Sequence, residues 1–164
     1  ALNQDELIFR KTFSKDHLVK TYPKSMAAKN VRVNSEIGID DDDFDAAKWL
    51  LTVYKKDGSK LNITLTEIKT LPKSEIVFDF KCVEGWDQIS HWGGVKFSDF
   101  IEHYNLPEEA ALNYVGISTT GDDYYVGLDM TSAMHPQTLL AYEVNDQPLP
   151  QDTWQPLVLF VTVK

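Results

Sequence analysis

Short β-rich segments separated by turn signals run through most of this chain, and they limit the folds it can adopt. They cover residues 49–54, 61–65, 75–81, 113–119, 124–128, 139–144 and 157–163. Brief helical patterns lie at residues 4–13, 64–72, 99–104 and 131–135. Strand and helix do not alternate regularly, and the sequence has no glycine-rich dinucleotide or phosphate-binding fingerprint. The pattern therefore predicts an α+β fold with mixed or antiparallel sheets and short helices.

Three local signals fix where elements begin and turn. Asp57-Gly58 lies between two β-rich segments, which predicts a hairpin. Thr64 followed by Glu67 is typical of a capping box that opens a helix. Ser98 is expected to cap a second helix over residues 99–104.

Composition narrows the classes of partner. The formal charge of −9 argues against nucleic acid or an anionic membrane surface as the main partner, because both require basic patches. No apolar run approaches the length of a transmembrane helix. The acidic run Asp40–Asp45 lacks the alternating ligands and the central glycine of an EF-hand, so a solvated loop is expected there.

Cys82 is the only cysteine. It cannot form an internal disulfide, so it packs as a small apolar residue, reacts as a nucleophile or binds a soft metal. The strand predicted over residues 75–81 leads into Cys82, and Gly85-Trp86 then forms a turn. No pair of histidines has the spacing of a zinc-binding helix, and no second cysteine is present for a structural zinc site. The residues alone leave the three roles of Cys82 open.

Several motifs, in order, resemble the molybdopterin-binding oxidoreductase domain of the sulfite oxidase family. The branch it most resembles contains the catalytic subunits of bacterial periplasmic methionine sulfoxide reductases. The motifs are Lys81–Trp86, Trp92–Val95, Phe97–Phe100, Ala133–Pro136, Leu139–Asn145 and Pro148–Pro150. The resemblance implies the sulfite-oxidase-type fold over residues 30–164, cut short at its C-terminus. Residues 1–29 are expected to be an N-terminal extension that packs on this domain.

The resemblance also implies roles for individual residues. Cys82 would ligate molybdenum, beside the dithiolene sulfurs of a pyranopterin, and a soft thiolate suits that metal. Glu84 would be a catalytic carboxylate near the metal. The remaining cofactor-binding candidates are Asn34, His91, Trp92, Gly93 and Gly94. Simpler interpretations stand beside these: Glu84 caps a turn, Trp92 packs in the core, and Gly93-Gly94 shapes a turn.

The chain departs from its family near the C-terminus. Val158 stands where relatives usually carry an arginine. Losing such a cation weakens the binding of a pterin phosphate, because charge-assisted hydrogen bonds are lost. Oxygen-atom transfer with a molybdopterin cofactor is the expected function. A cofactor-free binding or scaffold module and a thiol-dependent enzyme that uses Cys82 are the alternatives. Resemblance further implies a periplasmic location and a membrane-bound haem partner for electron transfer.

Overall fold

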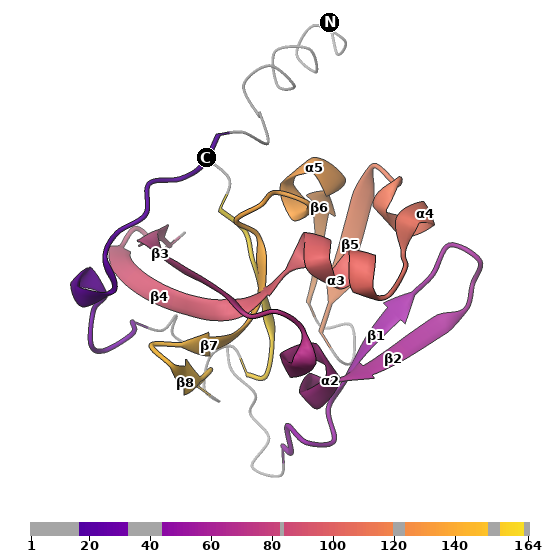
Figure 1. Cartoon of the computed structure of the whole chain (residues 1–164), viewed down its shortest axis with the longest axis horizontal. Coiled ribbons are helices and arrows are strands. Elements are labelled where there is room, and N and C mark those ends of the chain that lie inside the picture. The colour runs from indigo at the N-terminus through magenta and orange to yellow at the C-terminus, as the bar shows by residue number, and fades with distance from the viewer. Residues whose placement is uncertain (1–16, 33–43, 83, 120–123, 151–154, 163–164) are drawn as a thin grey trace, which may run out of the picture.

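The computed structural model describes residues 17–32, 44–82, 84–119, 124–150 and 155–162. In that part of the chain every strand pairing is antiparallel, and a central sheet is flanked by two separate hairpins (Figure 1). The elements in chain order are η1 (Lys24–Met26), β1 (Leu50–Tyr54), β2 (Lys60–Thr64), α2 (Leu65–Thr70), β3 (Ser74–Lys81), β4 (Asp87–Lys96), α3 (Phe97–His103), α4 (Pro107–Ala110), β5 (Tyr114–Ser118), β6 (Tyr125–Asp129), α5 (Met130–Ala133), β7 (Leu139–Val144), β8 (Gln147–Pro148) and β9 (Val158–Phe160). The predicted α+β class with antiparallel sheets is confirmed.

The two local signals nearest the N-terminal side of the domain are confirmed. Strands β1 and β2 form the predicted hairpin, and Gly58 has a positive φ of 84° in its turn. Thr64 and Glu67 then form the capping box of α2. The Thr64 side chain accepts from the Glu67 backbone N–H at 3.1 Å, and the Thr64 backbone N–H donates to Glu67 at 2.7 Å. Hydrogen bonds from Thr64 lower the pKa of the Glu67 carboxyl.

We expect Thr64→Ala to lower the free energy of unfolding by about 1 kcal/mol, the usual cost of losing an N-cap. The pKa of Glu67 is lowered in the folded state, so the ionised Glu67 carboxylate stabilises the fold at neutral pH through its hydrogen bonds to Thr64. This contribution to the free energy of unfolding is lost as the pH falls through the lowered pKa. Urea unfolding at several pH values measures both effects. Ser98→Ala is the matched control and should change stability little. An equal loss in both variants would contradict the assignment.

Ser98 is not the cap that its sequence predicts. Helix α3 begins one residue earlier, at Phe97, and its N-cap Lys96 makes no side-chain capping bond. The Ser98 hydroxyl instead lies 3.3 Å from Asp99. Phe97, Phe100 and Ile101 form the buried apolar side of α3. Beginning the helix at Phe97 includes this first apolar residue in the buried side.

Strand β4 is the longest element and the one that the sequence signals least well. Gly93 and Gly94 lie inside it, not in a turn, and both are buried. The pairing of β4 with β7 shifts register between them, which is a β-bulge. A Cβ atom on Gly94 would lie 2.1 Å from the carbonyl oxygen of Leu140. Glycine is therefore required at residue 94, because β7 passes too close for any side chain.

Two apolar clusters hold the central sheet to its surroundings. The first lies between the sheet, the helices and the flanking hairpins, and it includes Ile68, Val95, Phe100 and Leu140. The second is aromatic, and it joins Phe78 and Trp92 to Phe160 of β9. Strand β9 is shorter than the predicted segment 157–163, although Phe160 is buried as expected.

An N-terminal segment crosses one face of the β3–β4 hairpin. The backbone N–H of Tyr22 donates to Val77 of β3, and that of Ala28 donates to Ile89 of β4, both at 2.9 Å. Residues 17–32 thus pack on the domain; the boundary at residue 29 stays a prediction. The predicted helix at 4–13, residues 40–43 of the acidic run and Asn34 lie outside the described residues.

Candidate functional site

Cys82 lies at the start of the connection between β3 and β4. Its backbone N–H donates to the carbonyl of Trp86 at 2.9 Å, and its carbonyl accepts from Gly85 at 3.0 Å. Gly85 has a φ of +85°, a conformation that glycine adopts without strain. The Gly-Trp turn predicted from the sequence is therefore present, and it fixes the backbone on both sides of the thiol.

The sulfur of Cys82 is half-buried and faces a backbone donor. The N–H of Glu84 lies 3.5 Å from Sγ. A donor at this position suits a sulfur ligand that carries negative charge. Cys82 is partly exposed and backbone hydrogen bonds hold its turn, which is compatible with a metal ligand at this position.

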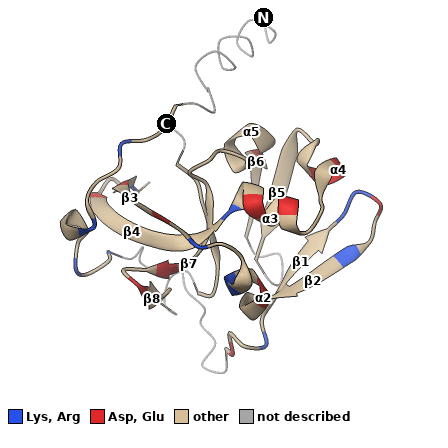
Figure 2. Ribbon diagram, in the orientation of Figure 1, with Lys and Arg blue, Asp and Glu red and all other residues tan. Residues whose placement is uncertain are grey.

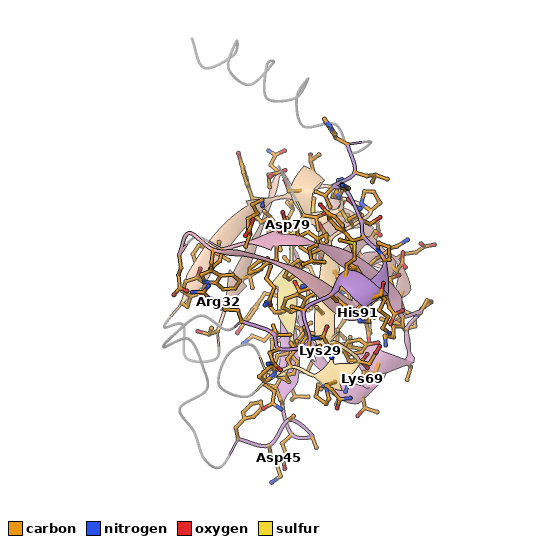
Figure 3. All side chains as sticks on the ribbon, turned by 90° about the vertical axis from the view of Figure 1, so that its left-hand side faces the viewer. Lys29, Arg32, Asp45, Lys69, Asp79 and His91 are labelled. Atoms are coloured by element: carbon orange, nitrogen blue, oxygen red, sulfur yellow. The ribbon has the colours of Figure 1, made fainter. Side chains whose placement is uncertain are left out.

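Glu84 is held by an aromatic neighbour in the same turn. Its carboxylate accepts from the indole N–H of Trp86 at 2.9 Å. The Trp86 ring packs against Phe80 at 5.6 Å, and the guanidinium of Arg32 lies 5.0 Å from its centre. Figure 3 labels Arg32 and shows its position at one side of the domain. Glu84 thus helps to order the turn, whatever else it does, and its catalytic role stays a prediction.

An apolar cavity of about 250 Å³ lies beside the β3–β4 hairpin, and Phe80, two residues before Cys82, is one of its walls. Its lining residues are Phe80, Trp92, Val158, Leu159, Phe160 and Val161. Side chains two apart on a strand point to the same face, so Phe80 lies on the face of β3 that also carries Ile76 and Phe78. Trp92 belongs to that face because it pairs with Ile76. Its indole donates to Ser90 at 2.9 Å and stacks on Phe160 at 4.4 Å. Trp92 is both a core residue and a wall of the cavity.

The structure does not bring His91 together with Cys82. His91 pairs with Val77, so its side chain points to the opposite face of the hairpin. Gly93 lies on that same opposite face, next to Lys73 and Glu143. Gly94 backs directly onto β7. The cofactor-binding roles of His91, Gly93 and Gly94 stay predictions. A thiol-dependent enzyme requires a histidine beside Cys82, and His91 does not fill that place.

Sequence reasoning missed most of the cavity. Phe80 could have been found from the sequence, because it lies on the predicted strand 75–81 only two residues before Cys82. The contribution of β9 to the cavity could not be predicted from the sequence. It depends on long-range pairing, because β7 lies between β4 and β9 and pairs with both.

Gly85→Ala tests whether the turn holds the thiol in place. We expect a loss of about 1–2 kcal/mol of stability, because alanine resists a positive φ. Gly58→Ala is the matched control, since Gly58 has nearly the same φ of +84° and open space around it. Both variants should lose similar stability, and only Gly85→Ala should change the rate at which a maleimide labels Cys82. Equal labelling rates in the two variants would show that the turn does not control the thiol.

A thiol in a hydrogen-bonded hairpin turn and an apolar cavity that begins two residues away are the features of this hairpin that bear on its class. Residues 37–164 match the family model described as the oxidoreductase molybdopterin binding domain. The chain belongs to that family.

Curated relatives place it within the sulfite oxidase family, near the methionine sulfoxide reductases, as the sequence motifs imply. A putative protein-methionine-sulfoxide reductase subunit, YedZ1 of Azospira oryzae, is 35% identical, with 93% of this chain and 57% of the relative covered. The protein-methionine-sulfoxide reductase catalytic subunit MsrP of Xanthomonas axonopodis pv. citri is 30% identical, with 71% of this chain and 40% of the relative covered. The chain therefore spans little more than half the length of the first of these and less of the second.

The fold agrees with this family. The crystal structure of the sulfane dehydrogenase SoxCD from Paracoccus pantotrophus superposes with a TM-score of 0.55 at 14% identity, covering 73% of this chain and 35% of that one. The sulfite-oxidase-type fold predicted from the sequence is confirmed.

Proposed function

We propose that this chain is the cofactor-binding part of a molybdopterin-dependent enzyme that transfers an oxygen atom to or from a sulfur compound. The partly exposed Cys82 carries the proposal. It lies in a turn held by backbone hydrogen bonds, two residues beyond Phe80, a wall of the cavity. In this proposal Cys82 is the protein ligand of molybdenum.

The described residues fit such a cofactor in its metal and ring portions. The thiol is a soft donor, and the cavity walls are apolar and aromatic, which suits a planar heterocycle. The described residues that line the cavity carry no positive charge, so cations for a pterin phosphate must come from beside it. Arg32, over the Trp86 ring, is the described cation that packs against the turn.

Each residue of the turn has its own part in the proposed reaction. When bound, a molybdenum cofactor would supply the two-electron redox chemistry. Cys82 would hold the metal, and the Trp86 indole keeps the Glu84 carboxylate beside the turn. Phe80 and Trp92 exclude water from the cavity.

A sulfoxide is the proposed substrate, free or within a protein, because the two curated relatives are named protein-methionine-sulfoxide reductases. The sulfoxide S–O bond breaks, the oxygen leaves as water with two protons, and two electrons reduce the sulfur to a thioether. A membrane-bound haem protein is the proposed electron donor. Among the described residues, no helix is long and apolar enough to cross a membrane. We further propose a periplasmic location, which a compartment-specific reporter fusion tests.

Metal and pterin analysis of the full-length protein, produced in a host that makes molybdopterin, tests the proposal directly. We expect one molybdenum and one pterin per chain. Molybdenum far below stoichiometric, with no pterin released by acid, would overturn it.

A cofactor-free binding module is the second candidate, favoured by one observation. Val158 lines the cavity, and the sequence motifs lead us to expect an arginine at this position. The surrounding protein carries a net charge of −9, and Figure 2 shows its basic residues scattered over the ribbon. Charge of this sign opposes an anionic cofactor. Stoichiometric molybdenum together with sulfoxide reduction in the full-length protein would exclude this candidate.

A further inference from the structure

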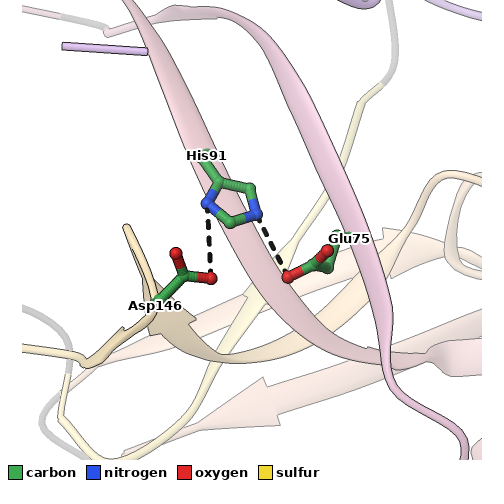
Figure 4. Close-up of side chains that lie close together, drawn as sticks. All are labelled: Glu75, His91 and Asp146. Atoms are coloured by element: carbon green, nitrogen blue, oxygen red, sulfur yellow. Dashed lines mark ion pairs between the residues drawn. The ribbon is translucent and has the colours of Figure 1, made fainter. Parts of the chain in front are cut away.

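Three side chains from separate parts of the sequence meet on the face of the β3–β4 hairpin opposite Phe80 and Trp92. Glu75 comes from β3, His91 from β4 and Asp146 from the turn between β7 and β8 (Figure 4). Each offers one ligand atom, and these atoms lie within 4.8 Å of one another. Nothing in the proposed chemistry of Cys82 uses this cluster.

His91 is the unusual member, because it is 2% exposed and its Nδ1 has no hydrogen-bond partner. A buried polar atom without a partner is costly, so such an atom in a folded protein calls for a ligand or water. Nδ1 points toward Asp146, whose Oδ1 is 3.9 Å away, too far for a hydrogen bond.

Open space lies beside the unpartnered nitrogen. A cavity of about 250 Å³ is lined by His91, Asp146, Asn145 and residues of the N-terminal segment, Lys24, Ala27, Ala28 and Lys29. Figure 3 shows Lys29 and His91 near each other on this side of the molecule. A cation of roughly 2.0–2.2 Å contact distance to nitrogen and oxygen fits between Nδ1 and Asp146 after a small movement.

The geometry also fixes which nitrogen is available. Nε2 of His91 lies 3.3 Å from Oε1 of Glu75. A carboxylate at this distance favours the proton on Nε2 and leaves the Nδ1 lone pair for a metal, an arrangement common around metal-bound histidines. Two hydrogen bonds from Asn145 hold the turn beside His91: its N–H donates to the His91 carbonyl at 2.9 Å, and its side-chain amide donates to the Ala28 carbonyl at 2.8 Å.

We propose that His91 and Asp146 bind a divalent transition metal ion such as zinc, with Glu75 orienting the imidazole. Nδ1 of His91 and a carboxylate oxygen of Asp146 are the protein ligands, and water completes the coordination from the cavity side. The imidazole donor selects zinc, cobalt or nickel over magnesium and calcium, which prefer oxygen ligands.

Lys24 competes with the metal for Asp146. Its ammonium lies 2.7 Å from Oδ2 and 2.8 Å from Oδ1, and it lowers the pKa of this carboxyl. Both groups are about half exposed, so the pair is weak and easily displaced. Removing the charge of Lys24 should therefore tighten metal binding, a result that a site elsewhere on the protein does not predict.

The test uses zinc titration by calorimetry in a Cys82→Ser background, because the thiol itself binds zinc. We expect one saturable zinc site, which magnesium does not occupy. Asp146→Asn should abolish it. Glu75→Gln should weaken it by about 10- to 100-fold, the usual cost of losing a group that orients a metal-bound histidine. Lys24→Met should strengthen it. Glu102→Gln, which removes an exposed carboxylate on α3, is the matched control and should leave binding unchanged.

Replacing His91 risks the fold, so the carboxylate and lysine variants carry the test. Each variant is first compared with its parent by thermal unfolding without metal. Cobalt gives a second measurement, since nitrogen ligation changes its visible spectrum and Asp146→Asn should remove that change. No zinc binding in the Cys82→Ser protein would overturn the proposal. Binding that is equally tight in Asp146→Asn and Glu75→Gln would also overturn it and assign the metal to another place.

Discussion

Gly94→Ala is expected to lower the free energy of unfolding by about 3 kcal/mol or more, at or beyond the upper end of the usual cost of overpacking. The added methyl group would lie 2.1 Å from the carbonyl oxygen of Leu140 and 2.6 Å from the Cα of Ala141. Both are backbone atoms of β7, so the central sheet must open to accept it. Small domains have only about 5–15 kcal/mol of total stability, and a loss of this size reduces the yield of folded protein.

Gly93→Ala provides the matched control one residue away. Its methyl group would meet the Cε atom of Lys73 at 2.9 Å, the flexible end of a partly exposed side chain that can move aside. We expect a loss of about 1 kcal/mol or less, the lower end of the same range. Chemical unfolding of both variants measures the difference. Similar losses in the two would show that β7 does not approach residue 94 as closely as described.

Cys82→Ser is expected to remove sulfoxide reductase activity from the full-length, cofactor-loaded protein while leaving its fold intact. An alcohol is a harder and less acidic ligand than a thiol, so it binds a soft-ligand metal poorly. Because loss of a residue that only orients a ligand costs about 10- to 100-fold, loss of the ligand itself should cost at least as much. Turnover of a methionine sulfoxide substrate, molybdenum content and thermal unfolding are the three measurements.

Ser118→Ala makes a suitable control, since Ser118 is an exposed residue at the end of β5, away from the central sheet. It should keep full activity and full molybdenum content. A Cys82→Ser protein that retains molybdenum and normal turnover would exclude Cys82 as the metal ligand.

The elements that the sequence predicts well are those set by neighbouring residues. The Asp57-Gly58 turn fixes the β1–β2 hairpin, and the capping box fixes the start of α2, because both depend on contacts within a few residues. Strand β4 was missed because Gly93 and Gly94 are poor strand formers. Glycine is required at residue 94 because β7 approaches it closely. The neighbouring residues in the sequence do not indicate this long-range contact.

The candidate site also has a part that local sequence predicts and a part that depends on long-range pairing. Cys82 and its turn are local, and the sequence motifs identify them. The β9 side of the cavity depends on long-range strand pairing. The cluster of Glu75, His91 and Asp146 depends on it too, because Asp146 reaches His91 only through the β7–β8 turn. The sequence predicts His91 as a cofactor-binding residue. Its side chain lies on the face of the hairpin opposite Trp92, and its cofactor-binding role stays a prediction.

The place of β9 in the sheet has a consequence for biosynthesis. A ribosome releases the Cys82 turn long before it makes Val158–Phe160, and until then one side of the cavity is missing. Trp92 also waits for its stacking partner Phe160. The nascent chain thus has its thiol early and its completed cavity late. Under the proposed function, the cofactor would be enclosed only after translation has passed β9.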